Sequence, residues 1–390
     1  MTPINIILFL ILVASIVCLV FVLYDVWHDF SIWQSRIHIG RWNNLESWNA
    51  AITTRAAKWL KHTPIVPKTD YQNLLLWHRL KEPGENNTIQ SWQIAGLIMG
   101  LNSKFYKIGD SEIKKLIDRF SNNPNVDKAL FAYSLLNIDN PTEAERKLIN
   151  DFSEKTRDDL LLALGTNKTI PYRKNMPAIR FVDTLGFVCP FLARYGIMTK
   201  EESLVELSEY QIKEYRSFFH PVLQLPPHAY NIHHSCPMGV YDWGRGIGWY
   251  ILSLTETRRS IINFGPSRIE FYNYLCKQIK ELADTLILFQ KDNGGFSMFL
   301  TDEGGQYESS ATVMCGLLFV DAYEITGEEK YIIAAKRTIE ALMSVTQRNG
   351  AIDFCQGDTK GVALYSTRLT VMPFIQGLSV LLATRYVSNS

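Results

Sequence analysis

Residues 308–346 have the sequence ESSATVMCGLLFVDAYEITGEEKYIIAAKRTIEALMSVT, and their pattern decides the fold class. Apolar residues recur at spacings of three and four, the period of an α-helix with one buried face. In the second half, the residues on the apolar face are Tyr331, Ile332, Ala335, Ile339 and Leu342. The charged residues that lie mostly on the opposite face are Glu329, Lys330, Lys336 and Arg337. Gly327 separates the halves as a helix C-cap would, so the stretch predicts two helices, 308–325 and 328–346.

The same spacing recurs along most of the chain, whereas alternating apolar and polar residues never run long enough to predict a sheet. The other predicted helices are 45–62, 71–81, 88–100, 110–120, 124–138, 142–164, 178–196, 200–217, 246–258, 267–290 and 367–386. Residues 292–295 and 349–350 are turn-like and would close short hairpins.

Repeated helical hairpins can stack as an open array or close into a ring. An open array needs a polar-faced capping repeat, but the last predicted helix keeps Leu378, Leu381 and Leu382 apolar. A closed ring buries such helices without a cap. No linker rich in Pro, Gly or Ser divides residues 45–390, so we predict one all-α toroidal domain there.

The N-terminus predicts a membrane anchor. Residues 6–24 carry no charge and, as a helix, would be about 28 Å long, enough to cross the hydrocarbon core of a bilayer. A cleaved signal peptide is disfavoured because no basic residue precedes the run and no small-x-small site follows it. A buried core helix is the alternative. We therefore predict an anchor at 1–25 that binds the lipid bilayer through 6–24, followed by a juxtamembrane segment at 26–44.

The charges that flank the apolar run only weakly indicate on which side of the membrane the C-terminal domain lies. Arg36 and Arg41 follow the apolar run and no Lys or Arg precedes it, which favours a cytoplasmic side for the C-terminal domain. Asp25 and Asp29 dilute that signal.

Composition excludes several classes of function. Forty basic residues against thirty-nine acidic residues give a formal charge of +1, so no excess of cations predicts nucleic-acid binding. Hydrophobic residues make up 47% of the chain, which excludes disorder. Aromatic residues make up 12%, which suits both a large core and the stacking of sugar rings. The six cysteines are scattered, so they indicate neither a disulfide framework nor a cellular compartment.

The segment 218–245 is the longest stretch without helical periodicity, and it holds four of the eight histidines. Such a long loop is usually functional or disordered, and its aromatic residues argue for function. His228, His233, His234 and Cys236 permit a zinc-site interpretation, but their spacing matches no closed zinc pattern. A polar loop without a metal is the commoner explanation, and we predict no metal or cofactor.

The loop leads into Trp243-Gly-Arg-Gly-Ile-Gly-Trp249, which opens a predicted helix. Glycines let the backbone approach a ligand, Arg245 can bind a carboxylate with two hydrogen bonds, and the tryptophans can stack on a sugar. The alternative is a helix N-terminus packed tightly in the core. A dinucleotide-binding fingerprint is excluded because the glycine spacing differs and no strand precedes it.

Two aspartates stand near apolar helix starts. Asp183 lies within Phe181-Val-Asp-Thr-Leu-Gly, and Asp127 within Asn-Val-Asp-Lys-Ala-Leu-Phe. Half-burial would raise the pKa of either carboxyl group, which suits a proton donor at neutral pH. The alternative for both is a helix N-cap or a first-turn acid.

Several of these segments resemble the unsaturated glycuronyl and rhamnogalacturonyl hydrolases of glycoside hydrolase families 88 and 105. Residues 181–196 resemble the stretch that carries the family's catalytic Asp, and residues 243–250 resemble its Trp-Ala-Arg-Gly-x-Gly-Trp signature. Residues 307–314 resemble a Glu-x-Ser-x-x-x-Met helix start, and residues 228–231 a His-x-x-Asp element. The resemblance covers roughly residues 120–386 and implies an (α/α)6 barrel without a metal or cofactor.

Carried over to this chain, the resemblance implies that Asp183 is the general acid and base and that Asp127 is a second carboxylate beside the reacting ring. Trp243, Arg245 and Trp249 would line the uronate pocket, and His228 would contact substrate. The implied substrate is an oligosaccharide with a 4,5-unsaturated uronic acid at its non-reducing end. Its enol ether would be hydrated by protonation at C4 and addition of water at C5.

The chain also departs from the family pattern at the substrate-facing wall. Tyr172 and Arg173 replace a His-Lys pair, Phe181 replaces a tryptophan, and Asn231 replaces an acid. Tyr172 and Arg173 are therefore candidate substrate-binding residues with a changed preference. The alternative function is a catalytically inactive glycan-binding or polysaccharide-assembly protein built on the same barrel.

Overall fold

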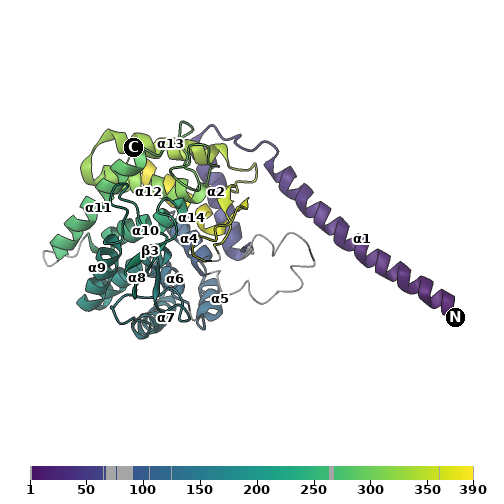
Figure 1. Cartoon of the computed structure of the whole chain (residues 1–390), viewed down its shortest axis with the longest axis horizontal. Helices are drawn as coiled ribbons and strands as arrows, with labels where there is room; N and C mark the ends of the chain where they lie inside the picture. The colour runs from purple at the N-terminus through teal and green to yellow at the C-terminus, as the bar shows by residue number, and fades with distance from the viewer. Residues whose placement is uncertain are drawn as a thin grey trace.

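The computed structural model describes residues 2–64, 66, 76, 91–104, 106–123, 125–262, 268–359 and 361–389 (Figure 1). Apart from Leu76, the predicted helix 71–81 lies outside the described residues, as does the start of the predicted helix 88–100. The other predicted helices are present; 110–120 has its predicted bounds, and the rest have shifted ends.

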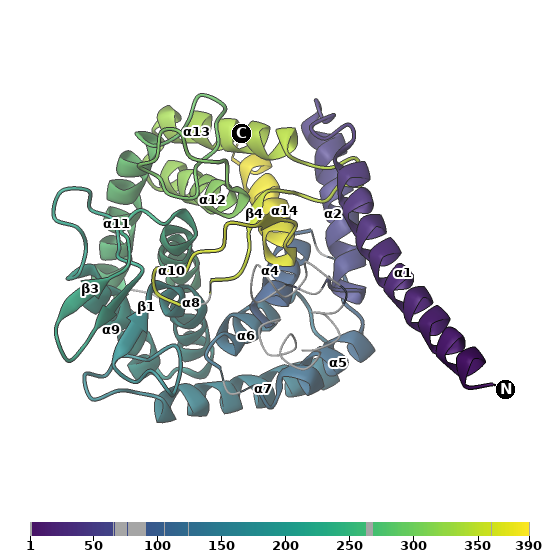
Figure 2. The ribbon, with the colours of Figure 1, turned by 45° about the vertical axis from the view of Figure 1, so that its right-hand side comes forward.

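Six helices in the described part of the chain form an inner ring (Figure 2). They are α4 (Ser91–Asn102), α6 (Lys128–Leu136), α8 (Val182–Thr199), α10 (Gly244–Ile261), α12 (Ser309–Thr326) and α14 (Pro373–Val387). Each inner helix packs against the next, and α14 returns to pack against α4. Most are apolar and buried on nearly every face, as helices enclosed on all sides must be. The predicted closed ring and the all-α (α/α)6 barrel are thereby confirmed.

An outer ring of amphipathic helices covers the inner one. These helices are α2 (Leu45–Lys61), α5 (Asp110–Phe120), α7 (Glu143–Leu162), α9 (Glu202–Arg216), α11 (Ile269–Ile287) and α13 (Glu329–Ser344). In α5 the buried residues are Ile113, Leu116, Ile117 and Phe120, a single stripe at helical spacing. One apolar stripe suffices because each outer helix faces solvent on its other side.

The ring closes where the first described inner helix meets the last, and glycines permit the contact. A Cβ atom on Gly377 of α14 would lie 1.9 Å from the carbonyl oxygen of Gly96 of α4. A Cβ atom on Gly100 would lie 2.1 Å from the carbonyl oxygen of Gly377. Any larger residue here would push the two backbones apart, so the seam of the barrel requires glycine at these positions.

Short strands correct the expectation that the chain contains no sheet. Strands β1 (Ile179–Phe181), β2 (Ala229–Asn231) and β3 (Cys236–Met238) form an antiparallel sheet, and β4 (Cys355–Gln356) pairs with β5 (Leu369–Thr370). Strands of two or three residues are too short to show alternation in the sequence.

These strands also correct three predicted boundaries. The predicted helix 178–196 begins only at Val182, because residues 179–181 pair with β2. The segment 218–245 is not a plain loop, since it contains the hairpin of β2 and β3. The predicted helix 367–386 begins at Pro373, because the ring of a proline keeps the residue before it extended.

The N-terminal helix α1 (Pro3–Arg36) projects from the barrel, and none of its residues is buried (Figure 1). The core-helix alternative is therefore wrong. Among the described residues α1 alone is long and apolar enough to cross a membrane, a test that N-terminal signal sequences also pass. It continues past the predicted anchor boundary at residue 25 to Arg36. There Arg36 donates to both carboxylate oxygens of Asp353, at 2.7 and 3.0 Å, and to the carbonyl of Leu369.

Candidate active site

The N-terminal ends of the inner helices meet at one mouth of the barrel and bring the candidate residues together. Asp183 lies in the first turn of α8, Asp127 immediately precedes α6, and Trp243 immediately precedes α10. Glu308 caps α12 by accepting hydrogen bonds from the backbone N–H groups of Ser310 and Ala311. Helix N-termini carry partial positive charge, so this mouth favours an anionic ligand.

A small cavity of about 50 Å³ lies at this mouth. The sequence-predicted residues that line it are Tyr172, Arg173, Asp183, His228, Trp243, Arg245 and Trp249. Asp127 is the one predicted residue that does not line it. The barrel thus brings together candidate residues from four segments that lie far apart in the sequence.

Asp183 has the chemistry of a proton donor. Its Oδ2 atom is buried and has no hydrogen-bond partner among the residues that the structure describes. Burial raises the pKa of Asp183 to about 7, even though the charges of Arg245 and Arg173 oppose the rise. A carboxyl group with a pKa near 7 exchanges a proton readily at neutral pH, as a general acid and base must.

Asp127 differs from Asp183 in two ways: it does not line the cavity, and its carboxylate has hydrogen-bond partners. Only 2% of Asp127 is exposed, and its carboxylate accepts hydrogen bonds from the Ser91 hydroxyl (2.6 Å) and the Asn123 amide (3.2 Å). Burial raises the pKa of Asp127 to about 6, against the effect of these two hydrogen bonds and of Arg173. Asp127 occupies the N-cap position of α6, as the alternative expected, but its side chain makes no capping hydrogen bond to that helix.

His228 is neutral and fixed in place. Its Nδ1 atom lies 3.0 Å from the hydroxyl oxygen of Tyr365, and its ring packs against Trp243 with centroids 4.4 Å apart. Burial lowers the pKa of His228 to about 3. The ring is therefore uncharged at neutral pH and can offer a hydrogen bond but no charge.

The zinc interpretation of the 218–245 segment does not fit the structure. His233, His234 and Cys236 are exposed on the β2–β3 hairpin, whereas His228 is buried at the cavity. Across the described ranges, no three His, Cys, Asp or Glu side chains are grouped so as to hold a metal ion.

Arg245 and Trp243 both bind the end of β4, and Arg245 also binds the residue that follows it. Arg245 donates to the carbonyls of Gln356 and Gly357 and to the hydroxyl of Ser310. The indole N–H of Trp243 donates to the side chain of Gln356 at 2.8 Å. In this conformation the guanidinium of Arg245 therefore positions a loop of the cavity wall, and three of its N–H groups are already engaged.

Aromatic rings form the back and side of the cavity. Trp249 packs edge-on against Phe187, with centroids 4.7 Å apart, and against Trp92 at 5.6 Å. On the side, the guanidinium of Arg173 lies over the ring of Tyr172, 4.9 Å from its centroid. Arg173 is exposed, and its guanidinium makes no hydrogen bond or ion pair with the described residues. Its charge is therefore available to a ligand.

Sequence reasoning missed several residues of the wall. Trp92, Asp358 and Thr359 also line the cavity. Asp358 helps to raise the pKa of Asp183, and the buried hydroxyl of Thr359 has no hydrogen-bond partner within the described ranges. Trp92 could have been suspected as an aromatic residue near the start of an inner helix. The segment with Asp358 and Thr359 has no periodicity, so no pattern identified it.

Comparison with known proteins gives both a sequence and a structural match. The sequence model of Glycosyl Hydrolase Family 88 matches residues 102–389. A search of curated proteins finds no match to the sequence.

Three similar solved structures illustrate the structural match. A possible member of glycoside hydrolase family 105 from Klebsiella pneumoniae has a TM-score of 0.69 and 18% identity, covering 88% of this chain and 93% of its own. The unsaturated glucuronyl hydrolase from Bacillus sp. GL1, described as responsible for the degradation of glycosaminoglycan, has a TM-score of 0.62 and 15% identity, covering 86% and 94%. A family 88 glycosyl hydrolase from Bacteroides vulgatus has a TM-score of 0.60 and 12% identity, covering 87% and 99%. At these identities the likeness establishes the fold.

Proposed function

The chain belongs to Glycosyl Hydrolase Family 88, and on that premise we propose that it is a membrane-anchored glycoside hydrolase. Its substrate is an oligosaccharide that carries a 4,5-unsaturated uronic acid at the non-reducing end. The reaction is hydration of the enol ether, with Asp183 as general acid and base. The similar hydrolase from Bacillus, which is named for unsaturated glucuronyl substrates, supports this substrate class.

The observation that carries the proposal is the burial of the Asp183 carboxyl group and its raised pKa. Its buried, unpartnered Oδ2 atom and its pKa of about 7 suit a carboxyl group that gives up a proton and takes one back. In the proposed reaction Asp183 protonates C4, and the ionised carboxylate then accepts a proton from the water that attacks C5. The resulting hemiketal collapses and releases the saturated sugar.

The other charged groups divide the remaining tasks. Asp127, held by Ser91 and Asn123, supplies a fixed negative charge once it is ionised above pH 6, and this charge stabilises positive charge on the reacting ring. Arg173 is the best candidate to bind the uronate carboxylate, because its guanidinium is free while that of Arg245 is engaged with the backbone. His228 serves as a neutral hydrogen-bonding partner of the sugar.

The small size of the cavity means that the proposed reaction requires the cavity to widen. At about 50 Å³ it is smaller than a pocket that encloses a small-molecule ligand, which usually measures at least about 300 Å³. The lining side chains, among them those of Asp358 and Thr359, therefore have to move apart before a sugar ring can enter. A different observation favours the second candidate function, a barrel that binds glycans without turning them over: Tyr172 and Arg173 stand where the family has a His-Lys pair.

One assay separates the two functions. An unsaturated disaccharide loses its ultraviolet absorbance when the C4–C5 double bond is hydrated. We expect the purified chain to remove this absorbance, and Asp183→Asn to bind the disaccharide without removing it. Binding without turnover by the unmodified chain would favour the glycan-binding function. Unchanged turnover in Asp183→Asn would refute the role of Asp183.

The anchoring proposal rests on α1. Beyond the uncharged run, the exposed aromatic residues Trp27, Phe30 and Trp33 follow one another at helical spacing, as residues at a membrane–water interface do. We propose residues 1–25 as the anchor, 26–44 as the juxtamembrane segment and 45–390 as the catalytic domain. The chain should stay with membranes through high-salt and alkaline washes. Protease access in intact cells and spheroplasts should reveal the side of the domain, with the cytoplasmic side weakly favoured by Arg36 and Arg41.

A further inference from the structure

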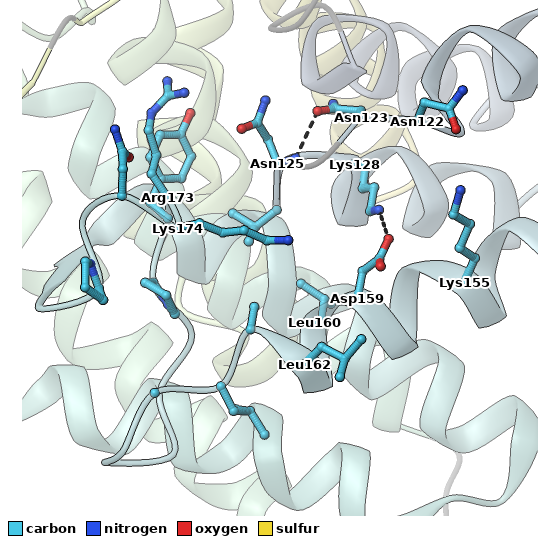
Figure 3. A pocket seen from close by; sticks show the side chains of 18 of the residues that line it. Asn122, Asn123, Asn125, Lys128, Lys155, Asp159, Leu160, Leu162, Arg173 and Lys174 are labelled. Carbon is cyan, nitrogen blue, oxygen red and sulfur yellow. Dashed lines mark hydrogen bonds and ion pairs between the residues drawn. The ribbon is translucent and has the colours of Figure 1, made fainter.

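A second and much larger cavity adjoins the candidate active site. Its volume is about 810 Å³, and it lies between the α5–α6 connection, the C-terminal half of α7 and the loop before β1 (Figure 3). Tyr172 and Arg173 line both cavities. Asn123, which holds the carboxylate of Asp127, lines the larger one. A ligand with its end in the small cavity can therefore continue into the large one past Arg173.

The charge of this large cavity is strongly one-sided. Its lining has four cationic side chains, Lys128, Lys155, Arg173 and Lys174, and a single carboxylate, Asp159. Lys128 is buried and forms an ion pair with Asp159. Lys174 is exposed and, within the described part of the chain, makes no hydrogen bond or ion pair. Figure 3 shows Lys174 extending from its loop into the cavity toward the Lys128–Asp159 pair.

The polar groups beside these cations suit sugar hydroxyls. Asn122, Asn125 and Asn175 line the cavity, and their side-chain amides have no hydrogen-bond partner in the described ranges. An amide offers two donors and an acceptor, which matches a hydroxyl that both donates and accepts. The chain as a whole carries a net charge of only +1, so the local excess of cations is a feature of this cavity and not of the surface in general.

We infer that the large cavity binds the sugars that follow the terminal unsaturated uronate, and that it selects oligosaccharides with an anionic substituent on those sugars. Lys174 supplies the charge that recognises the substituent, and the asparagine amides bind neighbouring hydroxyls. The inference rests on the proposed function, since it extends the same substrate beyond the small cavity. Sulfate and carboxylate groups share the required chemistry.

The test compares Lys174→Gln with Lys277→Gln, a matched control on the exposed side of α11 that lines neither cavity. The substrates are three unsaturated tetrasaccharides whose inner sugars carry a sulfate, a carboxylate or no charge. We expect Lys174→Gln to raise KM for the charged tetrasaccharides about five-fold or more relative to the uncharged one, with kcat nearly constant. Added salt should weaken binding of the charged substrates to the unmodified chain.

Each outcome decides the inference. An effect with both charged substrates supports recognition of any anion, and an effect with one alone identifies sulfate or carboxylate as the group recognised. Equal effects on charged and uncharged substrates, or no effect in Lys174→Gln, would overturn it. If the unmodified chain turns over none of the substrates, the proposed function fails by itself. Calorimetric binding of the same tetrasaccharides to both variants then still tests the cavity.

Discussion

The Oδ2 atom of Asp183 and the Nε2 atom of His228 lie 4.0 Å apart, too far for a hydrogen bond. Burial raises the pKa of Asp183 to about 7 and lowers the pKa of His228 to about 3. Near pH 7 the pair therefore consists of a carboxyl group that titrates and an imidazole that does not. Of the two groups, only the carboxyl of Asp183 exchanges a proton near neutral pH, which suits its proposed role as general acid and base.

The first prediction concerns the pH dependence of kcat/KM. If Asp127 has to be ionised and Asp183 protonated, activity falls below about pH 6 and above about pH 7, following the pKa values of these two groups. Asp127→Asn should abolish the acidic limb in any residual activity. His228→Asn should lower the rate but keep both limbs, because the imidazole is neutral throughout this range. A limb that disappears in His228→Asn would contradict the assignment.

The second prediction concerns stability. Folding raises the pKa of Asp183 from its ordinary value of 3.8 to about 7, so the folded state binds the proton more tightly than the unfolded state. The resulting stability is complete below pH 3.8 and is lost as the pH rises through about 7. At 1.36 kcal/mol per pKa unit the loss is at most about 4 kcal/mol. Asp183→Asn cannot ionise and so avoids this loss. The difference between its Tm and that of the unmodified chain should therefore grow, in favour of the variant, from pH 5 to pH 8.

Calorimetric or fluorescence melting curves over that range would measure the difference. The matched control is Asp118→Asn, on the exposed face of α5, which should shift Tm little at any pH. A constant difference between Asp183→Asn and the unmodified chain would show that the carboxyl group is not disfavoured by burial.

The third prediction tests the link between α1 and the barrel. Arg36→Ala removes the partner of Asp353, of which only 1% of the side chain is exposed. A buried carboxylate that loses its cation typically costs 3–5 kcal/mol. We expect about 2 kcal/mol in the free energy of unfolding, because Arg36 is one-third exposed and Gln347 still donates to Asp353. Denaturant unfolding measures the loss, and Arg41→Ala, which removes an exposed cation nearby, should change it little.

The fourth prediction tests the glycine seam of the ring. Gly377→Ala would bring a methyl group within 1.9 Å of the carbonyl oxygen of Gly96, so α4 and α14 would have to separate. We expect a destabilisation of about 3 kcal/mol or more, or failure to fold. Gly109→Ala is the control, because a Cβ atom there meets no neighbour within 4 Å. Near-normal stability of Gly377→Ala, measured by denaturant unfolding, would show that the seam can relax.

The sequence predicted the parts of the fold that depend on long apolar periodicity. Paired helices such as 308–325 and 328–346 repeat this period, and the apolar end of the chain correctly indicated a closed ring. The hairpin at 229–238 was missed because its strands are three residues long and owe their conformation to pairing across the site. Secondary structure that depends on a distant partner leaves little trace in local sequence.

The residues of the candidate site also divide into those that local sequence reveals and those that only the folded structure reveals. Asp183, Trp243 and Arg245 were found because their local sequence is unusual, and the structure places them on one cavity. Asp358 and Thr359 come from an irregular segment whose position is set by hydrogen bonds from Arg245 and Trp243 to its beginning. Sequence also could not show that Arg245 is engaged and Arg173 is free, because that depends on which carbonyl groups lie within reach after folding.

The length of α1 bears on how the barrel would be carried. Residues 26–36 continue the helix beyond the proposed anchor for about 16.5 Å, at 1.5 Å per residue, and Arg36 forms an ion pair with Asp353 just before β4. The connection between the proposed anchor and the barrel is therefore rigid and not flexible. A membrane-held barrel would therefore present its mouth at a fixed height and angle above the lipid. Glycan chains attached to the same membrane would reach the mouth only from the directions that this angle allows.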